Sequence, residues 1–517
     1  MDPRTAPHAP ARPTRTRARA PLAAGLALAA HATLAQAPAS PPSAPVGDET
    51  QVAAPLPAPS ASDAFADFRR EFDAGRYAAA EPHARRVLEF AEAAARTPTD
   101  EEVQVAVMNL AMTQSLMGDY TAAESSYLRA IELVEASGRP LHARRARAYG
   151  GLASAYHEDG RHEAAVENFE RAVALTRRHE GLLTEAQLPL LEKYVDSLTE
   201  LGRFPDALKN HRYVLRIATR RHGEESPELA PTLERIGRWY TRVGLYEQAR
   251  RTLRRAIDLV QAAEGGRSPK LVGPLTALAQ CNRRQILDPD QRFYASPDPE
   301  RAALYHDPRV AGVAAGTIPV SQSTLAAEAE RALLLAVEIA ERRTDRSHVQ
   351  VADVHTQLGD WYQSRALPER ALPSYQKAWS AAQQAEQQIE GRPFVEALFG
   401  KPTLLLVVRP DDWDKYGARP PTEVETRNVV LEFTVREDGS AARPTVVDDS
   451  GDARRAAKTA TALESARFRP RFENGQPVPT TGVTFTQPWI VLLPTEAPEG
   501  NAATPRAAAP ERDGKAT

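Results

Sequence analysis

The feature that most constrains this chain is a short marker that returns at a fixed interval. The marker is a glycine, followed two residues later by an aromatic residue or histidine and then by alanines. Gly118, Gly160, Gly202 and Gly244 stand 42 residues apart, and Gly75 begins the series 43 residues before Gly118. A fixed interval of this length predicts stacked structural repeats rather than one globular core.

Each repeat is predicted to be two antiparallel helices joined by a tight turn. In the second repeat, Gly118 supplies the backbone conformation of the turn, which a Cβ atom would oppose. Ala123 and Ala130 let the second helix approach the first closely, and Tyr127 fills the gap beside them. Because one helix pair cannot bury its own apolar face, successive pairs are expected to stack into a superhelix.

The first helix of each unit carries a matching large residue. In four consecutive units it is Leu110, Leu152, Tyr194 and Ile236. Together with the glycine, aromatic and alanine positions, this pattern resembles the tetratricopeptide-repeat (TPR) family. The resemblance covers residues 61–386 and implies a mostly α-helical TPR superhelix of about seven repeats.

The interval is longer than the usual TPR period of about 34 residues. A connector after the second helix, His222–Glu228, accounts for part of the additional length. Period and connector together are similar to the longer TPR subclass typified by kinesin light chains. The sixth repeat is also interrupted, because Ala256 and Ala336 are 80 residues apart where one period is expected. We therefore predict a proline-rich inserted loop at residues 286–323.

Beyond about residue 386 the apolar pattern changes from a helical period to alternation. Leu431, Phe433 and Val435 alternate with polar residues, and the hairpin turn Asp438-Gly439 follows. A capped helix, a second turn and a last strand come next, at Asp452–Leu463, Asn474–Gly475 and Val483–Val491. This order of strand, strand, helix and strand predicts a small α+β domain at residues 400–493.

The α+β domain resembles the C-terminal domain of the TonB family of energy transducers. The matching segments are Val429–Val435, Ala466–Pro470 and Asn474–Val478. In that family the domain binds outer-membrane transporters by pairing a strand with their periplasmic peptide, so that main-chain hydrogen bonds supply the affinity. The resemblance implies a strand-pairing edge on the last strand, at Val483, Phe485, Trp489 and Val491.

The two ends of the chain differ from its centre in composition. Residues 1–37 are typical of a secretory signal peptide, with basic residues, a short apolar run and a small-residue cleavage site at Ala35–Ala37. Residues 38–60 hold seven prolines and predict an extended linker. The proline-rich residues 494–517 predict a disordered tail.

Two interpretations of the N-terminal segment remain open. Cleavage after Ala37 would release a periplasmic protein into a Gram-negative type of envelope. Retention would leave an anchor in the inner membrane, and only then is contact with a membrane expected. A spanning helix needs roughly 20 apolar residues, whereas His31, Thr33 and Gln36 interrupt this run, so that cleavage is the favoured interpretation.

Composition argues against several classes of function. The chain has 65 basic and 68 acidic residues and a net charge of -3, which does not predict a nucleic-acid partner. Its one cysteine, Cys281, excludes an intramolecular disulfide and a cysteine-based metal site, and its apolar neighbours predict a buried side chain. The sequence has no nucleophile elbow, phosphate-binding loop or zinc-protease helix. We therefore expect no catalytic centre, cofactor or metal.

A partner-binding groove is expected on the first helices of the repeats, where residues four apart share one face. The residues projected onto this face are Met108, Met112, Glu192, Asp196, Glu200, Arg238 and Arg242. The two methionines suit an apolar side chain of a bound peptide. The charged residues would either bind a peptide of mixed charge or form ion pairs between neighbouring helices, and the sequence leaves both interpretations open.

Three hypotheses about function follow. The first is a periplasmic adaptor whose TPR groove binds a protein or peptide and whose TonB-like domain docks an envelope partner, such as a TonB-dependent transporter. The second is a membrane-anchored, atypical TonB-type energy transducer for outer-membrane transport. The third is an enzyme with its site in the insertion, where Asp290, His306 and Asp307 lie without a recognised spacing.

Overall fold

The structure, a computed structural model, describes most of the chain between residues 60 and 493. The described residues are 60–138, 143–287, 320–342, 347–406 apart from 386 and 390, then 410, 412, 413 and 415, and 423–493. The predicted signal peptide and tail, nearly all of the predicted linker and most of the predicted insertion lie outside these residues. The same holds for Asp290, His306 and Asp307.

The chain divides into two compact units. Unit 1 consists of residues 1–282, 327–357 and 374–400, and unit 2 of residues 283–326, 358–373 and 401–517. The division passes through helices as well as between them, so that the ends of some repeat helices belong to the same unit as the C-terminal sheet. Each unit is described below by itself.

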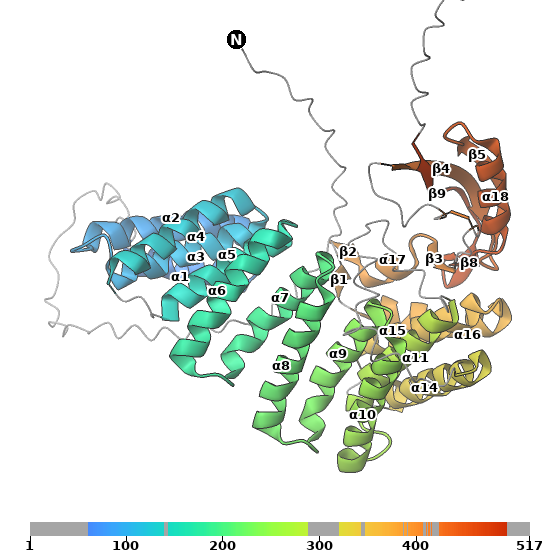
Figure 1. Cartoon of the computed structure of the whole chain (residues 1–517), viewed down its shortest axis with the longest axis horizontal. Helices are drawn as coiled ribbons and strands as arrows, with labels where there is room; N and C mark the ends of the chain where they lie inside the picture. Colours follow the sequence, from blue (N-terminus) through green and yellow to red (C-terminus); the bar gives the residue numbers. More distant parts are fainter. Residues whose placement is uncertain are drawn as a thin grey trace, which may run out of the picture. The chain divides into compact units, whose positions relative to one another are not determined.

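Unit 1 is built from antiparallel helix pairs that stack side by side (Figure 1). We call the first helix of each pair the A helix and the second the B helix. Five complete pairs come first: α1 (Ala61–Asp73) and α2 (Tyr77–Ala94), α3 (Glu101–Met117) and α4 (Tyr120–Ala136), α5 (Ala143–Glu158) and α6 (His162–Glu180), α7 (Leu188–Glu200) and α8 (Phe204–His222), α9 (Ala230–Arg242) and α10 (Tyr246–Glu264). The alternation continues with α11 (Val272–Leu287), α14 (Gln322–Arg342), α15 (His348–Ser364) and α16 (Pro368–Gln383). The predicted helical repeats are confirmed.

The turn inside each pair requires a left-handed backbone conformation. The marker glycines Gly75, Gly118, Gly160, Gly202 and Gly244 all have φ between 72° and 84°, which a residue with a Cβ atom adopts at a cost. In the last pair Ala366 takes this place with φ of 57°. The marker that revealed the repeats is therefore a requirement of the turn geometry.

A second recurring turn contributes to the long period. The B helices α6, α8 and α10 each end at a glycine with positive φ, and a one-turn 3₁₀ helix follows. These short helices are η1 (Glu185–Gln187), η2 (Pro227–Leu229) and η3 (Pro269–Leu271). Thr184, Ser226 and Ser268 precede them, and each side chain accepts a hydrogen bond from the backbone N–H two residues later. In these three repeats the connector supplies part of the additional length of the period.

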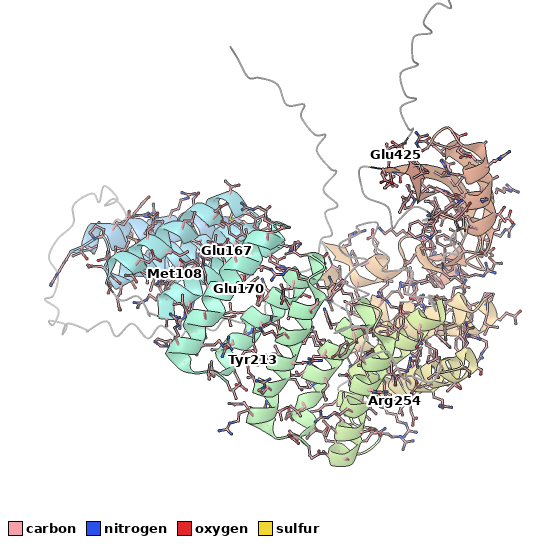
Figure 2. All side chains as sticks on the ribbon, viewed as in Figure 1. Met108, Glu167, Glu170, Tyr213, Arg254 and Glu425 are labelled. Atoms are coloured by element: carbon pink, nitrogen blue, oxygen red, sulfur yellow. The ribbon has the colours of Figure 1, made fainter. Side chains whose placement is uncertain are left out.

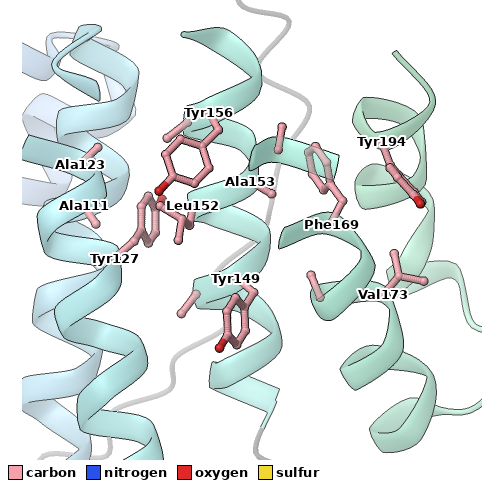
Figure 3. Packing of buried hydrophobic residues seen from close by; sticks show 14 of the residues in the cluster. Ala111, Ala123, Tyr127, Tyr149, Leu152, Ala153, Tyr156, Phe169, Val173 and Tyr194 are labelled. Atoms are coloured by element: carbon pink, nitrogen blue, oxygen red, sulfur yellow. The ribbon is translucent and has the colours of Figure 1, made fainter. Parts of the chain in front are cut away.

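Aromatic rings hold successive pairs together (Figure 3). Tyr127 from α4 packs beside α5, where the neighbouring residue Gly151 has no side chain; a Cβ atom there would lie 2.3 Å from the ring. Phe169 on α6 is completely buried and its ring centroid lies 6.1 Å from that of Tyr194 on α7. Burial of such a side chain stabilises the fold by about 1.5–3 kcal/mol. Cys281 is buried as predicted, and burial raises the pKa of its thiol to about 11.

A short segment that the sequence did not predict closes the last helices of unit 1. It consists of the two-residue strands β1 (Gln388–Ile389) and β2 (Arg392–Pro393) and the helix α17 (Phe394–Phe399). Phe399 is completely buried, with its ring 6.1 Å from Tyr375 and 5.7 Å from Trp379 between centroids. An end cap of this kind covers apolar surface that the next repeat would otherwise bury.

Unit 2 contains the predicted α+β domain. Its main sheet has three antiparallel strands in the order β5 (Ala441–Asp448), β4 (Val424–Val435) and β9 (Thr480–Leu492). Alternate residues of β4, Val429 to Val435, are buried together with Ala456 and Leu463 of helix α18 (Ala453–Glu464). Two smaller pairs accompany the sheet: β3 (Thr403–Leu406) with β6 (Arg467–Arg469), and β7 (Arg471–Glu473) with β8 (Gln476–Val478).

The predicted turns and cap of this domain are confirmed. The side chain of Asp452 accepts hydrogen bonds from the N–H groups of Arg454 and Arg455 at 3.0 and 3.1 Å, which starts α18. Gly439 has φ of 73° in the β4–β5 turn. Asn474 and Gly475 have φ of 50° and 75°, as a two-residue turn between β7 and β8 requires.

Repeat residues 358–373 pack within unit 2 through two specific contacts. Asp360 and Arg469 form a two-pronged ion pair, with Nε–Oδ1 at 2.9 Å and Nη2–Oδ2 at 3.0 Å. Both side chains are only 10% exposed. The amide of Gln363 donates to the carbonyl of Asp438 in the β4–β5 turn at 2.6 Å. A buried pair of this geometry fixes orientation, because either charge left alone would be costly.

Candidate interaction surfaces

The acidic residues predicted for the groove lie together on the A helix α7. Each is joined to an arginine of the next A helix, α9. Glu192 forms an ion pair with Arg235, while Asp196 and Glu200 both form ion pairs with Arg242. The Asp196–Arg242 distance is 3.4 Å. The ion pairs between neighbouring helices, one of the two interpretations left open above, are therefore present. Binding of a peptide by this face stays a prediction.

Arg238 belongs to the same row of contacts. Its guanidinium lies 2.9 Å from Glu234 on its own helix and donates to Gln280 of α11 at 3.0 Å. Further pairs extend the row along the A helices: Arg144–Glu101, Lys193–Glu158, His157–Ser197 and Gln280–Gln357. We call this row of contacts, from α3 to α15, the A-helix ladder. Every member belongs to unit 1.

The charges of the ladder are accessible to solvent. The side chains of Asp196, Glu200 and Arg242 are 42%, 46% and 32% exposed. An ion pair at such a position contributes about 0–1 kcal/mol to stability, because water screens the charges. The ladder therefore aligns neighbouring helices weakly and leaves its oxygens and nitrogens open to a polar partner.

The predicted apolar part of the face is only half open. Met108 and Met112 on α3 are both half-buried. Met108 lies among the first helix pairs (Figure 2) and packs against the core of the array. A methionine with one side on the core and one side toward solvent can adapt its shape to an apolar side chain of a partner.

The outer edge of β9 in unit 2 offers a different kind of surface. The pairing of β4 with β9 runs without interruption from Val424–Leu492 to Phe433–Val483. The N–H of Leu493 donates toward β4, to Glu423, whereas the N–H of Ile490 donates to the carbonyl of Trp413, both at 2.9 Å. Since N–H groups alternate in direction along a strand, odd-numbered residues of β9 bond to β4 and even-numbered residues point outward.

The open part of this edge is short. Thr484 and Thr486 have outward backbone groups, and no strand of the described residues pairs with them. Pro488 has no N–H, and its carbonyl accepts the amide of Gln487 at 2.7 Å. Ile490 is already bonded to Trp413. We call the outward-facing backbone groups of residues 482–486 the β9 edge.

The four residues predicted for strand pairing lie on this strand, with their side chains directed elsewhere. Trp489 and Val491 are buried in the domain core, and Val483 and Phe485 pack against it. All four are odd-numbered, so that their backbone groups bond to β4. The residues with available donors and acceptors are their neighbours Thr484 and Thr486, which are exposed. The alternation of apolar residues predicts the strand itself. Only the hydrogen bonds of Ile490 and Leu493 identify which residues of the strand face outward.

The opposite edge of the sheet, formed by β5, is poorly suited to strand addition. Its pairing with β4 is broken by two register shifts. Arg443 has φ of 55°, and Pro444 follows it. Bulges and proline are devices that prevent another strand from pairing with an edge. The exposed side chains of Val446 and Val447 on this strand therefore do not mark an equivalent site.

Metal centres and membrane-spanning helices were sought in the part of the chain that the structure covers, and neither is found there. No group of three or more histidine, cysteine, aspartate or glutamate side chains could hold a metal ion. No described helix combines the length and the apolar character that a bilayer span requires.

Comparison with known proteins assigns both regions. The sequence pattern of the tetratricopeptide repeat matches residues 102–178 and 187–262. The pattern of the Gram-negative bacterial TonB protein C-terminal domain matches residues 425–487. The chain carries tetratricopeptide repeats and a TonB-type C-terminal domain. Both resemblances seen in the sequence are confirmed, as is the fold class. No curated protein sequence matches the chain.

Solved structures with helical repeats are similar over part of the chain. A kinesin light chain protein with nearly identical TPR-like repeats from Podosopora anserina shares 18% identity, covering 40% of this chain and 99% of that one, with a TM-score of 0.36. BtubC (BKLC) from P. vanneervenii shares 19%, covering 49% and 94%, with a TM-score of 0.33. The TPR2AB domain of yeast Sti1, solved with pHSP90, shares 13%, covering 63% and 91%, with a TM-score of 0.22.

The two assigned modules limit the function. TPR repeats and TonB-type C-terminal domains are non-catalytic interaction modules, and the latter points to the Gram-negative envelope. The repeats therefore point to protein partners. The TonB-type domain contains the β9 edge, since residues 482–486 fall within the matched segment.

Proposed function

We propose that this protein is a periplasmic adaptor that binds one protein partner on its TPR array and a second, transport-related envelope partner on its TonB-type domain. The observation that carries the proposal is the β9 edge: two residues with outward donors and acceptors, on a strand that is otherwise regular. Strand addition supplies main-chain hydrogen bonds to any extended peptide. A periplasmic segment of a TonB-dependent transporter is the partner we expect there.

The A-helix ladder is the proposed surface for the first partner. Its half-exposed carboxylates and guanidiniums pair with each other across neighbouring A helices. Each can instead form an ion pair with a bound peptide of mixed charge. Because each pair is worth only about 0–1 kcal/mol, opening one costs little. The half-buried Met108 and Met112 would receive an apolar side chain of the same peptide.

The strand-addition site is tested by removing one outward donor. In Thr484→Pro the bonds to β4 remain, because residue 484 points away from that strand, and Pro488 shows that β9 accepts proline at an outward position. Thr484→Val is the matched control, since it keeps the backbone N–H and removes only the hydroxyl. Binding of extended peptides from the periplasmic segments of TonB-dependent transporters is measured by calorimetry.

We expect Thr484→Pro to weaken binding about tenfold or more, because one partner hydrogen bond is lost and a carbonyl of the peptide stays unpaired. Thr484→Val should bind like the wild type. Equal binding by all three proteins would contradict strand addition at the β9 edge.

The location of the adaptor is tested separately, by mass spectrometry of the mature N-terminus. An N-terminus near Pro38 supports the periplasmic adaptor. An intact N-terminus in the inner-membrane fraction would replace it with the anchored energy transducer.

A further inference from the structure

A cavity of about 330 Å³ lies within unit 2, and none of its described lining residues belongs to the β9 edge. This volume is at the lower end of the range of about 300–1,000 Å³ for ligand pockets. Residues from α11, from the end of α15, from β3 and from β6 surround it. It therefore suits a small molecule or the tip of a peptide rather than a protein surface.

Three arginines from distant parts of the sequence meet at this cavity. Arg283 comes from α11, Arg365 from the turn after α15, and Arg467 from β6. Among the described residues that line the cavity there is no aspartate or glutamate. Because like charges repel, a cluster of this kind is costly unless an anion joins it.

Each of these guanidiniums contacts a neutral group. Arg365 lies over the ring of Trp361, 5.4 Å from its centroid. Arg467 donates through Nη1 to the carbonyls of Ala466 and Ser465 at 2.8 and 3.3 Å. Arg283 donates to the carbonyl of Leu405 at 3.1 Å. The free protein thus gives each guanidinium a contact with a neutral group.

The arginines of the cavity differ from those of the A-helix ladder in their partners. There, Arg242 contacts two carboxylates. In the described residues, no ion pair joins Arg365 or Arg467 to a carboxylate. The charge of Arg467 acts on Asp438, whose own oxygen accepts hydrogen bonds from Ser440. Burial raises the pKa of Asp438, but those hydrogen bonds and the charges of Arg436 and Arg467 outweigh it and lower the pKa overall.

Apolar side chains form the remaining wall. Trp361, only 2% exposed, Ile286, Leu287 and Leu406 line the cavity beside the arginines. A fully polar anion such as free phosphate would leave this wall without a contact. The lining fits a ligand with one anionic end and one apolar end.

We propose that this cavity binds a small organic oxyanion, a carboxylate or phosphate group carried on an apolar body. The planar guanidinium fork matches two oxygens of either group and forms strong, charge-assisted hydrogen bonds with them. The site shares no residue with the β9 edge or the A-helix ladder, so that its existence does not depend on the proposed adaptor function.

The test uses the full chain and four probes followed by calorimetry. N-acetylphenylalanine has a carboxylate on an apolar body, and N-acetylphenylalaninamide is the same body without the charge. Phenyl phosphate carries the alternative oxyanion, and inorganic phosphate lacks the apolar part. We expect N-acetylphenylalanine or phenyl phosphate to bind, with the tighter of the two identifying the source of the anion. The amide and inorganic phosphate should bind at least about tenfold more weakly.

Two variants locate the binding. Arg365→Gln and Arg467→Gln should each weaken binding of the preferred probe about tenfold or more. Arg454→Gln, which removes an exposed arginine of α18 in the same unit, should leave it unchanged. Arg365→Gln should fold normally, because Arg365 is exposed and lies in a turn. Circular dichroism checks this. Equal binding of amide and carboxylate, no binding of either organic anion, or an equal loss in Arg454→Gln would overturn the proposal.

Discussion

The A-helix ladder of unit 1 and the β9 edge of unit 2 satisfy their polar groups in opposite ways. In the ladder, side chains such as Glu200 and Arg242 find each other across neighbouring helices. At the β9 edge, the backbone groups of Thr484 and Thr486 have no strand beside them. A side-chain surface can select a partner by its charges, whereas a backbone edge accepts many extended sequences. We therefore expect selective binding by the repeats and general docking by the TonB-type domain.

Ion pairs sharpen this comparison, because the two units use them differently. Breaking the buried Asp360–Arg469 pair of unit 2 should have the largest effect. Asp360→Ala removes the carboxylate that pairs with the buried guanidinium of Arg469 and should cost about 3–5 kcal/mol in the free energy of unfolding. Urea denaturation measures this. The double variant Asp360→Leu/Arg469→Met should recover most of the loss, and a loss below about 1 kcal/mol in the single variant would contradict a buried pair.

Protonation of histidine at low pH should destabilise unit 1 more than unit 2. His211 on α8 is 5% exposed and lies 4.7 Å from Trp239 between ring centroids. Burial lowers the pKa of His211 to about 4, whereas an unfolded histidine has a pKa of about 6.5. The unfolded chain therefore binds the proton first as the pH falls. Stability present above about pH 6.5 should be lost progressively toward pH 4, by up to about 3 kcal/mol.

Thermal unfolding at several pH values checks the role of His211. His211→Leu keeps an apolar contact with Trp239 and removes the titrating group, so that its stability should fall less between pH 6.5 and 4. No histidine occurs in the described residues of unit 2. The same fall in stability in the wild type and in His211→Leu would show that other groups cause it.

A single substitution in the ladder should have a small effect. Arg242→Ala removes the partner of both Asp196 and Glu200, yet it should cost only about 0.2–1 kcal/mol, because all three side chains are solvent-exposed. The cost should shrink further at high salt. Denaturation at low and high ionic strength measures it. A loss of several kcal/mol, independent of salt, would make the ladder a structural element rather than an available surface.

A substitution in the turn of the last helix pair should change the free energy of unfolding only slightly. Ala366 has φ of 57°, where every other described turn between paired helices in the series has glycine. Ala366→Gly removes this strain but adds freedom to the unfolded chain, so that the net gain should be at most about 1 kcal/mol. Gly160→Ala should lower the free energy of unfolding by about the same amount. Thermal unfolding of the two variants provides the check, and destabilisation by Ala366→Gly would contradict the assigned backbone conformation.

The sequence predicted the repeats well, because the turn and close helix contacts restrict Gly118, Ala123 and Tyr127 individually. It predicted the hairpin at Asp438-Gly439 for the same reason. It did not predict α17, since Phe394–Phe399 is too short to show a helical period.

The candidate surfaces were predictable only in part. The ladder has a signal in the sequence, because Glu200 and Arg242 stand one period of 42 residues apart. The β9 edge depends on the bond between Ile490 and Trp413, which lies in an irregular segment. The arginine cavity brings together Arg283, Arg365 and Arg467, and no local pattern links residues so far apart in the chain.

The central claim is that the backbone of Thr484 and Thr486 is open to a partner strand. Amide hydrogen exchange at single-residue resolution tests it most directly. In the free protein we predict fast exchange at Thr484 and Thr486 and slow exchange at Val483 and Phe485, with the outward amides becoming protected when a transporter peptide binds. Slow exchange of the outward amides in the free protein, or no change on binding, would contradict the account.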